Sequence, residues 1–367
     1  MGKDTQIKIL HLETALEWRG GQQQIVYLLQ GLIANGIQTV LACSPKSEIM
    51  KYCRKNNLPV LPVEIGHGWD FSAARQIARF MQENAFNILH AHSSHALSLS
   101  LLVKTMRRSV KLVASRRVDF SVNKPVIGSL KYNNRLIDRI VCISENIARV
   151  LQQDGVDARK LTVIHSGIDV HRFVGVETSE LRAELNISSE HLIVGTVAAL
   201  VGHKDYPTLM QAAQLVCKKR ADVTFLAVGD GGDRGKLNAL HKELGLGDCF
   251  RFVGFRSDLQ RFYNLFDIFV LSSYLEGLGT SVLDALACGL PVVATRAGGI
   301  PEMIVHEQNG LLVEKKNPRE LAAGIERLIN DDALRERLSQ NARQSVKAFS
   351  YENMVQKHLM LYRELLD

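Results

Sequence analysis

The sequence predicts an α/β protein made of two domains, each a doubly wound parallel sheet. Its 367 residues are enough for about two domains. Short β-branched runs alternate with helical patterns, which is typical of parallel sheets built from βαβ units. This alternation lapses once, around residues 169–190, where we expect the domains to be joined.

The apolar runs give the expected elements. In the first half, strands are expected at residues 7–12, 39–43, 88–91, 111–114 and 139–143, with helices at 22–34, 73–83 and 144–153. In the second half, strands are expected at residues 191–198, 223–228, 250–253, 268–271 and 291–295, and three helices from residue 318 to the end. The predicted organisation is an N-terminal Rossmann-like domain (1–170), a linker (171–190), a C-terminal Rossmann-like domain (191–345) and a final helix (346–367) that packs back toward the first domain. Two such domains would face a central cleft, with ligands at the carboxyl ends of the strands.

Composition narrows the class of protein. Hydrophobic residues make up 46% and charged residues 23%, as in ordinary globular proteins. No apolar run is long enough to span a membrane, and the first residues do not read as a signal peptide. The six cysteines form no C-x-x-C pair, so we expect a reduced, cytoplasmic protein without disulfides or a cysteine-based zinc site.

Positive charge is concentrated in the first half. Residues 1–170 carry 22 Lys and Arg against 13 Asp and Glu, a balance of +9, whereas the remainder carries 23 against 25, or −2. Ten of these basic residues lie between Lys104 and Arg139. With the apolar Val126, Ile127 and Leu130 they could rest on an anionic membrane surface, or they could form an ordinary solvated face. Nucleic acid is not expected as a partner, because no recognised binding motif accompanies the charge.

Two glycine-rich segments follow predicted strands. Gly20 and Gly21 precede a helix and could let the backbone approach a ligand, or they could form an ordinary turn. Gly229 and Gly231 would fit a dinucleotide fingerprint, but Arg234 stands where that fingerprint needs a small residue. A βα turn that helps to line a cleft is the favoured interpretation of this second segment.

A third segment combines glycines with two carboxylates. The amides of Gly279, Thr280 and Ser281 would open a helix and could bind phosphate. Glu276 and Asp284 flank them and could bind sugar hydroxyls, so the segment fits a nucleotide sugar. The alternative is a capped surface helix with two unrelated acids. Lys204, which also follows a strand, could meet a diphosphate.

These segments together resemble the retaining glycosyltransferases of family 4, which have the two-domain GT-B fold. The resemblance covers nearly the whole chain in order and rests on these matching segments: Gly20-Gly21, His90-Ala91-His92, Cys142-Ile143-Ser144-Glu145, Val163-Ile164-His165-Ser166-Gly167-Ile168-Asp169, Lys204, Val228-Gly229-Asp230-Gly231, Val253-Gly254-Phe255, residues 272–284, Ala287-Cys288-Gly289-Leu290-Pro291-Val292-Val293-Ala294, Gly298-Gly299-Ile300-Pro301-Glu302 and Asn309-Gly310-Leu311-Leu312. Two positions depart from the family pattern. Asp284 replaces the second glutamate of E-x7-E, and Ala199 replaces an arginine whose contact His203 or Arg256 could supply.

The resemblance implies roles for individual residues. Glu276, Lys204 and His92 would be catalytic: Glu276 would contact the donor sugar, Lys204 the diphosphate, and His92 would lie near the reacting carbon. The donor would also be bound by eight further residues: Gly20, Gly21, Phe255, Arg256, Gly279, Thr280, Ser281 and Asp284. Charge stabilisation and positioning would drive a front-face attack with retention of configuration, without an enzymic nucleophile.

The acceptor is expected on the first domain. Arg116 and Arg117 follow a predicted strand there and suit a phosphorylated or carboxylated acceptor. No D-x-D triplet is present, so we expect neither a required metal nor a cofactor beyond the UDP- or GDP-type donor. The predicted function is a hexosyltransferase (EC 2.4) acting on a glycan or lipid-linked acceptor in cell-envelope polysaccharide or lipopolysaccharide synthesis, in the cytoplasm or on the inner face of the membrane. A sugar-nucleotide epimerase on the same fold and a non-catalytic two-lobed binding protein remain as alternatives.

Overall fold

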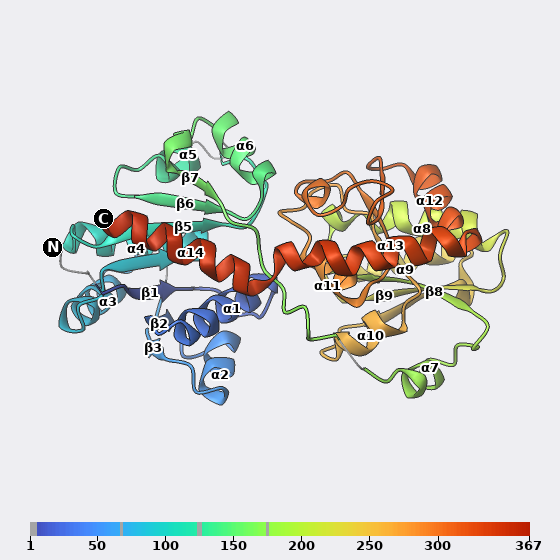
Figure 1. Cartoon of the computed structure of the whole chain (residues 1–367), viewed down its shortest axis with the longest axis horizontal. Coiled ribbons are helices and arrows are strands. Elements are labelled where there is room, and N and C mark those ends of the chain that lie inside the picture. The colour runs from blue at the N-terminus through green and yellow to red at the C-terminus, as the bar shows by residue number, and fades with distance from the viewer. Residues whose placement is uncertain (1–5, 67–68, 123–126, 174–175) are drawn as a thin grey trace. The chain divides into compact units, whose positions relative to one another are not determined.

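The computed structural model describes residues 6–66, 69–122, 127–173 and 176–367. The chain forms two compact units: unit 1 comprises Met1–Gly167 and Tyr351–Asp367, and unit 2 comprises Ile168–Ser350. Both are α/β units with a single parallel sheet (Figure 1). The segment expected to be a separate linker, residues 171–190, belongs to unit 2, and part of it forms a helix, α7 (Ser179–Glu184).

The sheet of unit 1 has seven parallel strands in the order β3-β2-β1-β4-β5-β6-β7. The strands are β1 (Lys8–Leu12), β2 (Gln38–Cys43), β3 (Val60–Pro62), β4 (Ile88–Ala91), β5 (Lys111–Arg116), β6 (Arg139–Cys142) and β7 (Leu161–Val163). The order reverses between β1 and β4, where the chain turns from building one half of the sheet to building the other. Loops diverge at such a switch point, which makes its carboxyl edge the usual ligand position.

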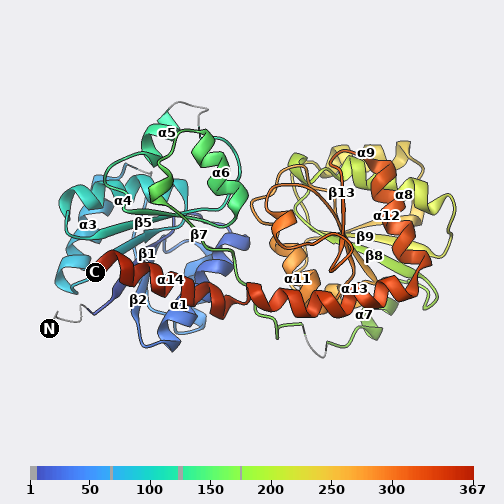
Figure 2. The ribbon, with the colours of Figure 1, turned by 45° about the horizontal axis from the view of Figure 1, so that its top comes forward.

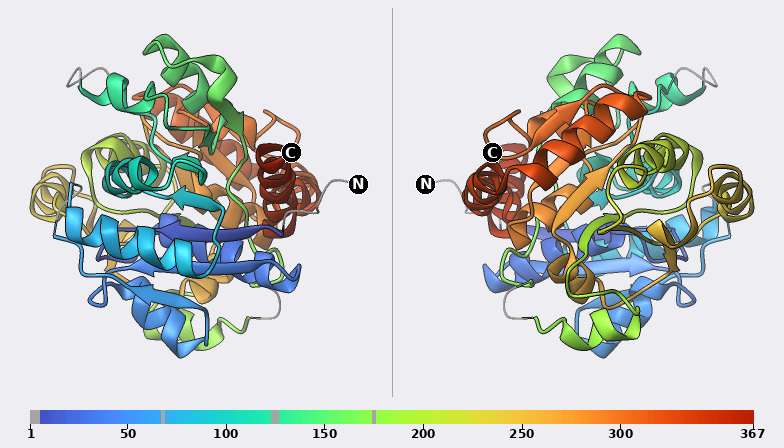
Figure 3. Two further views of the ribbon diagram at one scale, coloured as in Figure 1. Left: turned by 90° about the vertical axis from the view of Figure 1, so that its left-hand side faces the viewer. Right: turned by 90° about the vertical axis from the view of Figure 1, so that its right-hand side faces the viewer.

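Helices cover both faces of this sheet (Figures 1 and 3). They are α1 (Gly20–Ala34), α2 (Glu48–Lys55), α3 (Phe71–Glu83), α4 (Ser94–Met106), α5 (Ile127–Tyr132), α6 (Glu145–Gln153), the short η1 (Ala158–Lys160) and α14 (Tyr351–Leu366). The last helix lies beside α1, and the two pack together on β1, β4, β5 and β6 (Figure 2). Gly31 permits this contact, because a Cβ there would lie 2.4 Å from a methyl carbon of Val355.

Unit 2 contains six parallel strands in the order β10-β9-β8-β11-β12-β13. They are β8 (Leu192–Val197), β9 (Val223–Val228), β10 (Phe250–Gly254), β11 (Ile268–Leu271), β12 (Val292–Thr295) and β13 (Leu311–Val313). The remaining elements are η2 (Gly202–Lys204), α8 (Tyr206–Cys217), α9 (Arg234–Glu243), η3 (Gly247–Cys249), α10 (Leu259–Leu265), α11 (Thr280–Cys288), η4 (Ile300–Glu302), α12 (Pro318–Asn330), α13 (Asp332–Ser345) and η5 (Val346–Phe349). Side chains of α8 and α12 pack on strands of this sheet and form one core of buried aliphatic and aromatic residues with them. The switch point of this sheet lies between β8 and β11.

Ten predicted strands are present, most within one or two residues of the expected bounds. Three strands of three residues each were not predicted, β3, β7 and β13, since so short a run shows no alternation. The expectation of no disulfide is wrong for one pair: Cys217, at the end of α8, is bonded to Cys249, at the end of η3. Their Cα atoms are 6.5 Å apart, within the range that a disulfide spans.

Candidate functional site

Lys204 and Glu276 meet at the switch point of unit 2. Lys204 ends η2, after β8, and Glu276 follows β11, the strand next to β8. The Nζ of Lys204 forms an ion pair with Oε1 of Glu276, and the two side chains are only 16% and 9% exposed. The sheet order thus joins two predicted site residues that are 72 positions apart in the sequence.

The backbone of Glu276 is fixed by the segment after β12. A Cβ on Gly298 would lie 1.6 Å from the Glu276 carbonyl oxygen, and the φ of Gly298 is +50°, so only glycine fits there. The amide of Gly299 donates to the same carbonyl at 3.3 Å. Gly298 and Gly299 therefore fix the backbone of Glu276, from which its carboxylate extends.

The segment that carries Lys204 is held by β11 and the residues after it. The hydroxyl of Ser272 donates to the carbonyls of Lys204 (2.9 Å) and Asp205 (3.1 Å). The amide of Tyr274 donates to the carbonyl of His203 at 3.0 Å. Asp205 adopts a left-handed conformation, with a φ of 51°, where the chain turns from η2 into α8. The residues just before Glu276 therefore hold the backbone that carries Lys204.

The first turn of α11 provides amide groups beside Glu276. Gly279 is the N-cap with a φ of 92°, and no side chain caps the helix there. A Cβ on Gly279 would be 3.5 Å from Cγ of Glu276, so the helix begins in contact with that side chain. Thr280 and Ser281 are partly exposed. Amides at the start of a nine-residue helix favour a phosphate group electrostatically.

Asp284 lies one turn further along α11 and is partly buried. The hydroxyl of Tyr263 lies 3.3 Å from both Oδ2 of Asp284 and the Ser281 carbonyl. Burial raises the pKa of Asp284 to about 6, an effect that Arg172 and the Tyr263 hydrogen bond partly oppose. The carboxylate is therefore mostly ionised at pH 7 and can accept hydrogen bonds from hydroxyl groups.

The glycines after β9 are required for packing. A Cβ on Gly229 would lie 2.1 Å from the Ala198 carbonyl oxygen, and one on Gly231 would lie 2.5 Å from that of Leu200. The turn after β9 therefore crosses directly over the turn after β8. Close packing of these two turns is enough to require the two glycines, and no bound dinucleotide is needed to account for them. The contact also supports the segment that leads to Lys204.

The guanidinium of Arg256, predicted to bind the donor, is paired with two carboxylates of unit 2. Its guanidinium donates to Asp258 at 2.8 Å and to Glu184 at 2.9 Å, and it lies 5.0 Å from the centre of the Phe262 ring. Phe255 is 79% exposed, so it can stack on a ligand with little rearrangement.

In unit 1, four of the predicted residues gather at the switch point. Gly20 and Gly21 begin α1, and a Cβ on Gly21 would lie 3.5 Å from Cδ of Arg117. The guanidinium of Arg117 in turn donates to Nδ1 of His92 at 3.3 Å. His92 is 3% exposed, and its Nε2 lies 2.8 Å from Nδ1 of His11, so both of its ring nitrogens are engaged within unit 1.

Arg116, the last residue of β5, is directed elsewhere. Its guanidinium donates to the Phe120 carbonyl at 2.6 Å and to the Tyr132 hydroxyl at 3.2 Å, and it lies 5.3 Å from the centre of the Tyr132 ring. Of the two adjacent arginines, Arg117 is therefore the one beside the glycines. Sequence reasoning also missed Tyr263 and His11, because both lie in ordinary apolar segments without a motif.

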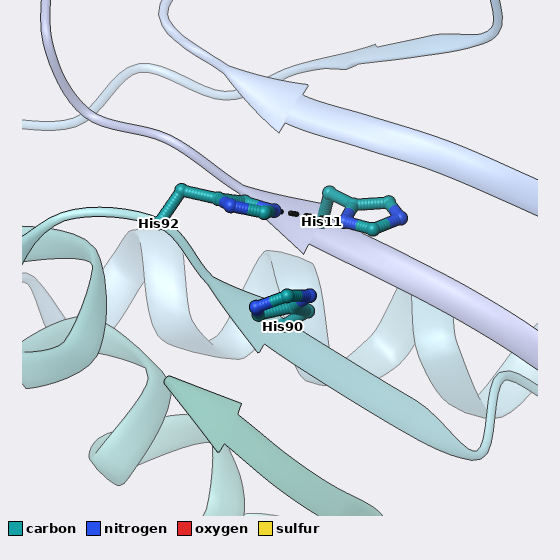
Figure 4. A group of neighbouring side chains, drawn as sticks. All are labelled: His11, His90 and His92. Atoms are coloured by element: carbon teal, nitrogen blue, oxygen red, sulfur yellow. Dashed lines mark hydrogen bonds between the residues drawn. The ribbon is translucent and has the colours of Figure 1, made fainter. Parts of the chain in front are cut away.

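Three histidines form the one group among the described residues that could hold a metal ion. Their nearest ligand atoms, on His11, His90 and His92, lie within 4.8 Å of one another, and all three are buried (Figure 4). The chemistry around them does not fit a cation. Five of the six ring nitrogens have hydrogen-bond partners, with His90 bonded to Tyr362 and Ser115. The guanidinium of Arg117 also places a positive charge against the group.

Two family models match consecutive parts of the chain. The model described as Glycosyltransferase Family 4 matches residues 18–172, and that described as Glycosyl transferases group 1 matches residues 177–345. The chain belongs to the group 1 glycosyltransferases of family 4. It is therefore an enzyme, a hexosyltransferase of class EC 2.4.

Relatives of this glycosyltransferase act on several acceptors. N-acetyl-alpha-D-glucosaminyl L-malate synthase of Bacillus anthracis is 26% identical over 81% of this chain and 80% of its own length. The lipopolysaccharide core biosynthesis glycosyltransferase LpsE of Rhizobium meliloti is 32% identical over 62% of this chain and 64% of its own length. A third, the N,N'-diacetylbacillosaminyl-diphospho-undecaprenol alpha-1,3-N-acetylgalactosaminyltransferase of Campylobacter jejuni, is 30% identical over 66% of this chain and 64% of its own length.

Solved structures agree on the fold. Anabaena HepE in complex with UDP-glucose has a TM-score of 0.85 and 22% identity, covering 98% of this chain and 99% of its own. The lipopolysaccharide outer core galactosyltransferase WaaB has a TM-score of 0.75 and 14% identity, covering 96% and 99%. At these identities the likeness shows two Rossmann-like domains and no more. Over the part of the chain that the structure describes, no helix is both long and apolar enough to cross a membrane.

Proposed function

We propose that this glycosyltransferase moves a sugar, with retention, from a UDP- or GDP-type nucleotide sugar to a hydroxyl of a glycan or lipid-linked acceptor in cell-envelope synthesis. The observation that carries the proposal is the Lys204–Glu276 ion pair beside the uncapped start of α11. It offers a cation and amide groups to a diphosphate, and a carboxylate to sugar hydroxyls. HepE binds UDP and UDP-glucose, which favours a donor of this kind.

The proposed chemistry needs no enzymic nucleophile. Lys204 and the amides of Thr280 and Ser281 would stabilise the charge that develops on the departing diphosphate, usually the largest catalytic contribution. Glu276 would fix the sugar through its hydroxyls, and Asp284 would bind those of the ribose. The acceptor hydroxyl would then attack from the face that the phosphate leaves, and a phosphate oxygen would take its proton. We propose that no metal is required, so transfer should persist in EDTA.

Acceptor chemistry follows from unit 1. Arg117 beside Gly21 suits an acceptor that carries phosphate or carboxylate. LpsE and the Campylobacter enzyme are named for lipopolysaccharide and undecaprenol-linked substrates, which favours an envelope acceptor. The exposed Phe120 and Leu130 lie within the basic region of residues 104–139, so we propose peripheral attachment to the cytoplasmic face of the membrane. Val126 and Ile127 were also predicted to belong to this surface, but Val126 and the side chain of Ile127 lie outside the part that the structure describes.

Product analysis tests the proposal. The protein is incubated with UDP- and GDP-sugars, with and without lipid-linked acceptors, and the products are separated and their anomeric configuration determined. Transfer that requires acceptor and retains configuration is expected, and Lys204→Ala should abolish it. A changed nucleotide sugar without acceptor would instead indicate an epimerase, and binding without any turnover would indicate a binding protein. Co-sedimentation with anionic vesicles at low salt tests membrane attachment separately.

A further inference from the structure

A series of hydrogen bonds links Arg117 to two of the buried histidines of unit 1. Nη2 of Arg117 lies 3.3 Å from Nδ1 of His92, and Nε2 of His92 lies 2.8 Å from Nδ1 of His11. Figure 4 shows the His92 ring pointing at His11; His90 takes no part in this series of hydrogen bonds, although its ring centre lies 4.1 Å from that of His92. Arg117 and His92 directly follow β5 and β4, and His11 is the last but one residue of β1; the three strands are neighbours in the sheet.

These hydrogen bonds all donate in one direction, from Arg117 toward His11. A guanidinium can only donate hydrogen bonds, so Nδ1 of His92 accepts, and its proton must lie on Nε2. Nε2 of His92 then donates to Nδ1 of His11, which leaves the proton of His11 on its Nε2. Burial lowers the pKa of His11 to about 3 and that of His92 well below its usual value, so each ring carries one proton at pH 7. Nε2 of His11 is buried and has no hydrogen-bond partner among the described residues, so the direction is set at the Arg117 end of the series and not at His11.

We propose that His92 and His11 are positioning residues for Arg117. His92 accepts from the guanidinium and holds it beside Gly21, and His11 accepts from Nε2 of His92 and so holds that ring in the orientation that faces Arg117. The inference rests on the proposed function, in which Arg117 binds an anionic group of the acceptor. It assigns His92, expected from the sequence to act near the reacting carbon, to that acceptor site. The two adjacent arginines have different partners: Arg117 is bonded to His92, whereas Arg116 is bonded to Phe120 and Tyr132.

Nitrogen NMR of the whole chain tests the direction without any substrate. With ¹⁵N-labelled histidine at pH 7, His92 is expected as the neutral Nε2–H tautomer, and Arg117→Met should mix its tautomers. An Nδ1–H tautomer or an imidazolium at His92 in the wild-type protein would overturn the proposal. Added Zn²⁺ is expected to leave these signals unchanged, and shifts typical of metal-bound imidazole would also overturn it. None of these results depends on transferase activity, so they are separate from a failure of the proposed function.

A matched pair of variants tests the consequence for Arg117. His11→Asn keeps an acceptor near the place of Nδ1, whereas His11→Leu removes it. Inorganic phosphate is titrated as the probe, and the Nε–H signal of Arg117 is followed. Phosphate should bind about fivefold more weakly in His11→Leu, as expected for the loss of one orienting hydrogen bond, and almost normally in His11→Asn. Equal weakening in both variants, or in neither, would contradict a positioning role. Thermal unfolding of both variants shows that each remains folded.

Discussion

The ammonium of Lys204 pairs with the carboxylate of Glu276, so a diphosphate that takes Lys204 as its partner competes with that carboxylate. Glu276→Gln removes the competing charge and its repulsion of phosphate. We expect a free nucleoside diphosphate, UDP or GDP, to bind about fivefold more tightly, a gain of about 1 kcal/mol. Sugar transfer should fall, because the carboxylate that orients the sugar is lost.

Calorimetric titration and initial rates measure these two effects separately. Glu314→Gln is the matched control, because it neutralises an exposed glutamate paired with Arg296. It should change neither quantity. A parallel loss of nucleotide affinity and transfer in Glu276→Gln would contradict the competition between carboxylate and diphosphate.

Asp284 gives a pH-dependent prediction. Burial raises its pKa in the folded protein to about 6, above the value of about 3.9 for an unfolded aspartate. The folded state therefore favours the protonated form, and the ionised form destabilises the fold as pH rises from about 4 through 6. Asp284→Asn should raise the free energy of unfolding by about 3 kcal/mol at pH 7 and by only about 0.5 kcal/mol at pH 4.

Urea unfolding at the two pH values measures this difference. The amide can still accept from Tyr263, so the hydrogen bond is preserved. Nucleotide affinity should fall at pH 7, since a neutral amide is a weaker acceptor for ribose hydroxyls. If the variant were less stable than the wild type at pH 7, a buried charge at Asp284 would not be the dominant effect.

At the scale of elements, the segment after β12 acts as a support for the one after β11. Gly298→Ala places a Cβ against the Glu276 carbonyl and strains a left-handed residue. We expect a loss of at least about 2 kcal/mol in the free energy of unfolding and a loss of nucleotide binding. Gly232→Ala is the control, since a Cβ there has no neighbour within 4 Å. Thermal shifts with and without UDP or GDP compare the two, and equal behaviour would contradict the supporting role.

Elements also show where the sequence was informative. β9 and β11 were predicted at their observed bounds because each is a buried apolar run between turns. The sequence also placed Glu276, Gly279 and Lys204 in segments that follow predicted strands and lead into helices. It could not show that Lys204 and Glu276 touch, because that depends on which strands are neighbours. It could not show that Gly229 and Gly231 serve packing, since a close backbone approach leaves the same glycines as a ligand site.

At the scale of the molecule, each unit has a core of its own. Leu359 of α14 is buried against the sheet of unit 1, although it follows all of unit 2 in the chain. Leu338 of α13 is buried in the core of unit 2. Truncation of a buried leucine costs about 2–5 kcal/mol. Because neither cluster contains residues of the other unit, we expect Leu359→Ala and Leu338→Ala to destabilise different units.

Amide hydrogen exchange, read separately for each unit, measures this. Leu359→Ala should accelerate exchange in β1, β4 and β5, and Leu338→Ala in β8, β9 and β11. A nucleotide that binds only folded unit 2 adds about 2.7 kcal/mol at a hundredfold excess over its Kd. UDP or GDP at that excess should therefore offset Leu338→Ala and leave the exchange of unit 1 in Leu359→Ala fast. Faster exchange in both units of either variant would mean that the chain unfolds as one body, and rescue of Leu359→Ala would place nucleotide contacts in unit 1.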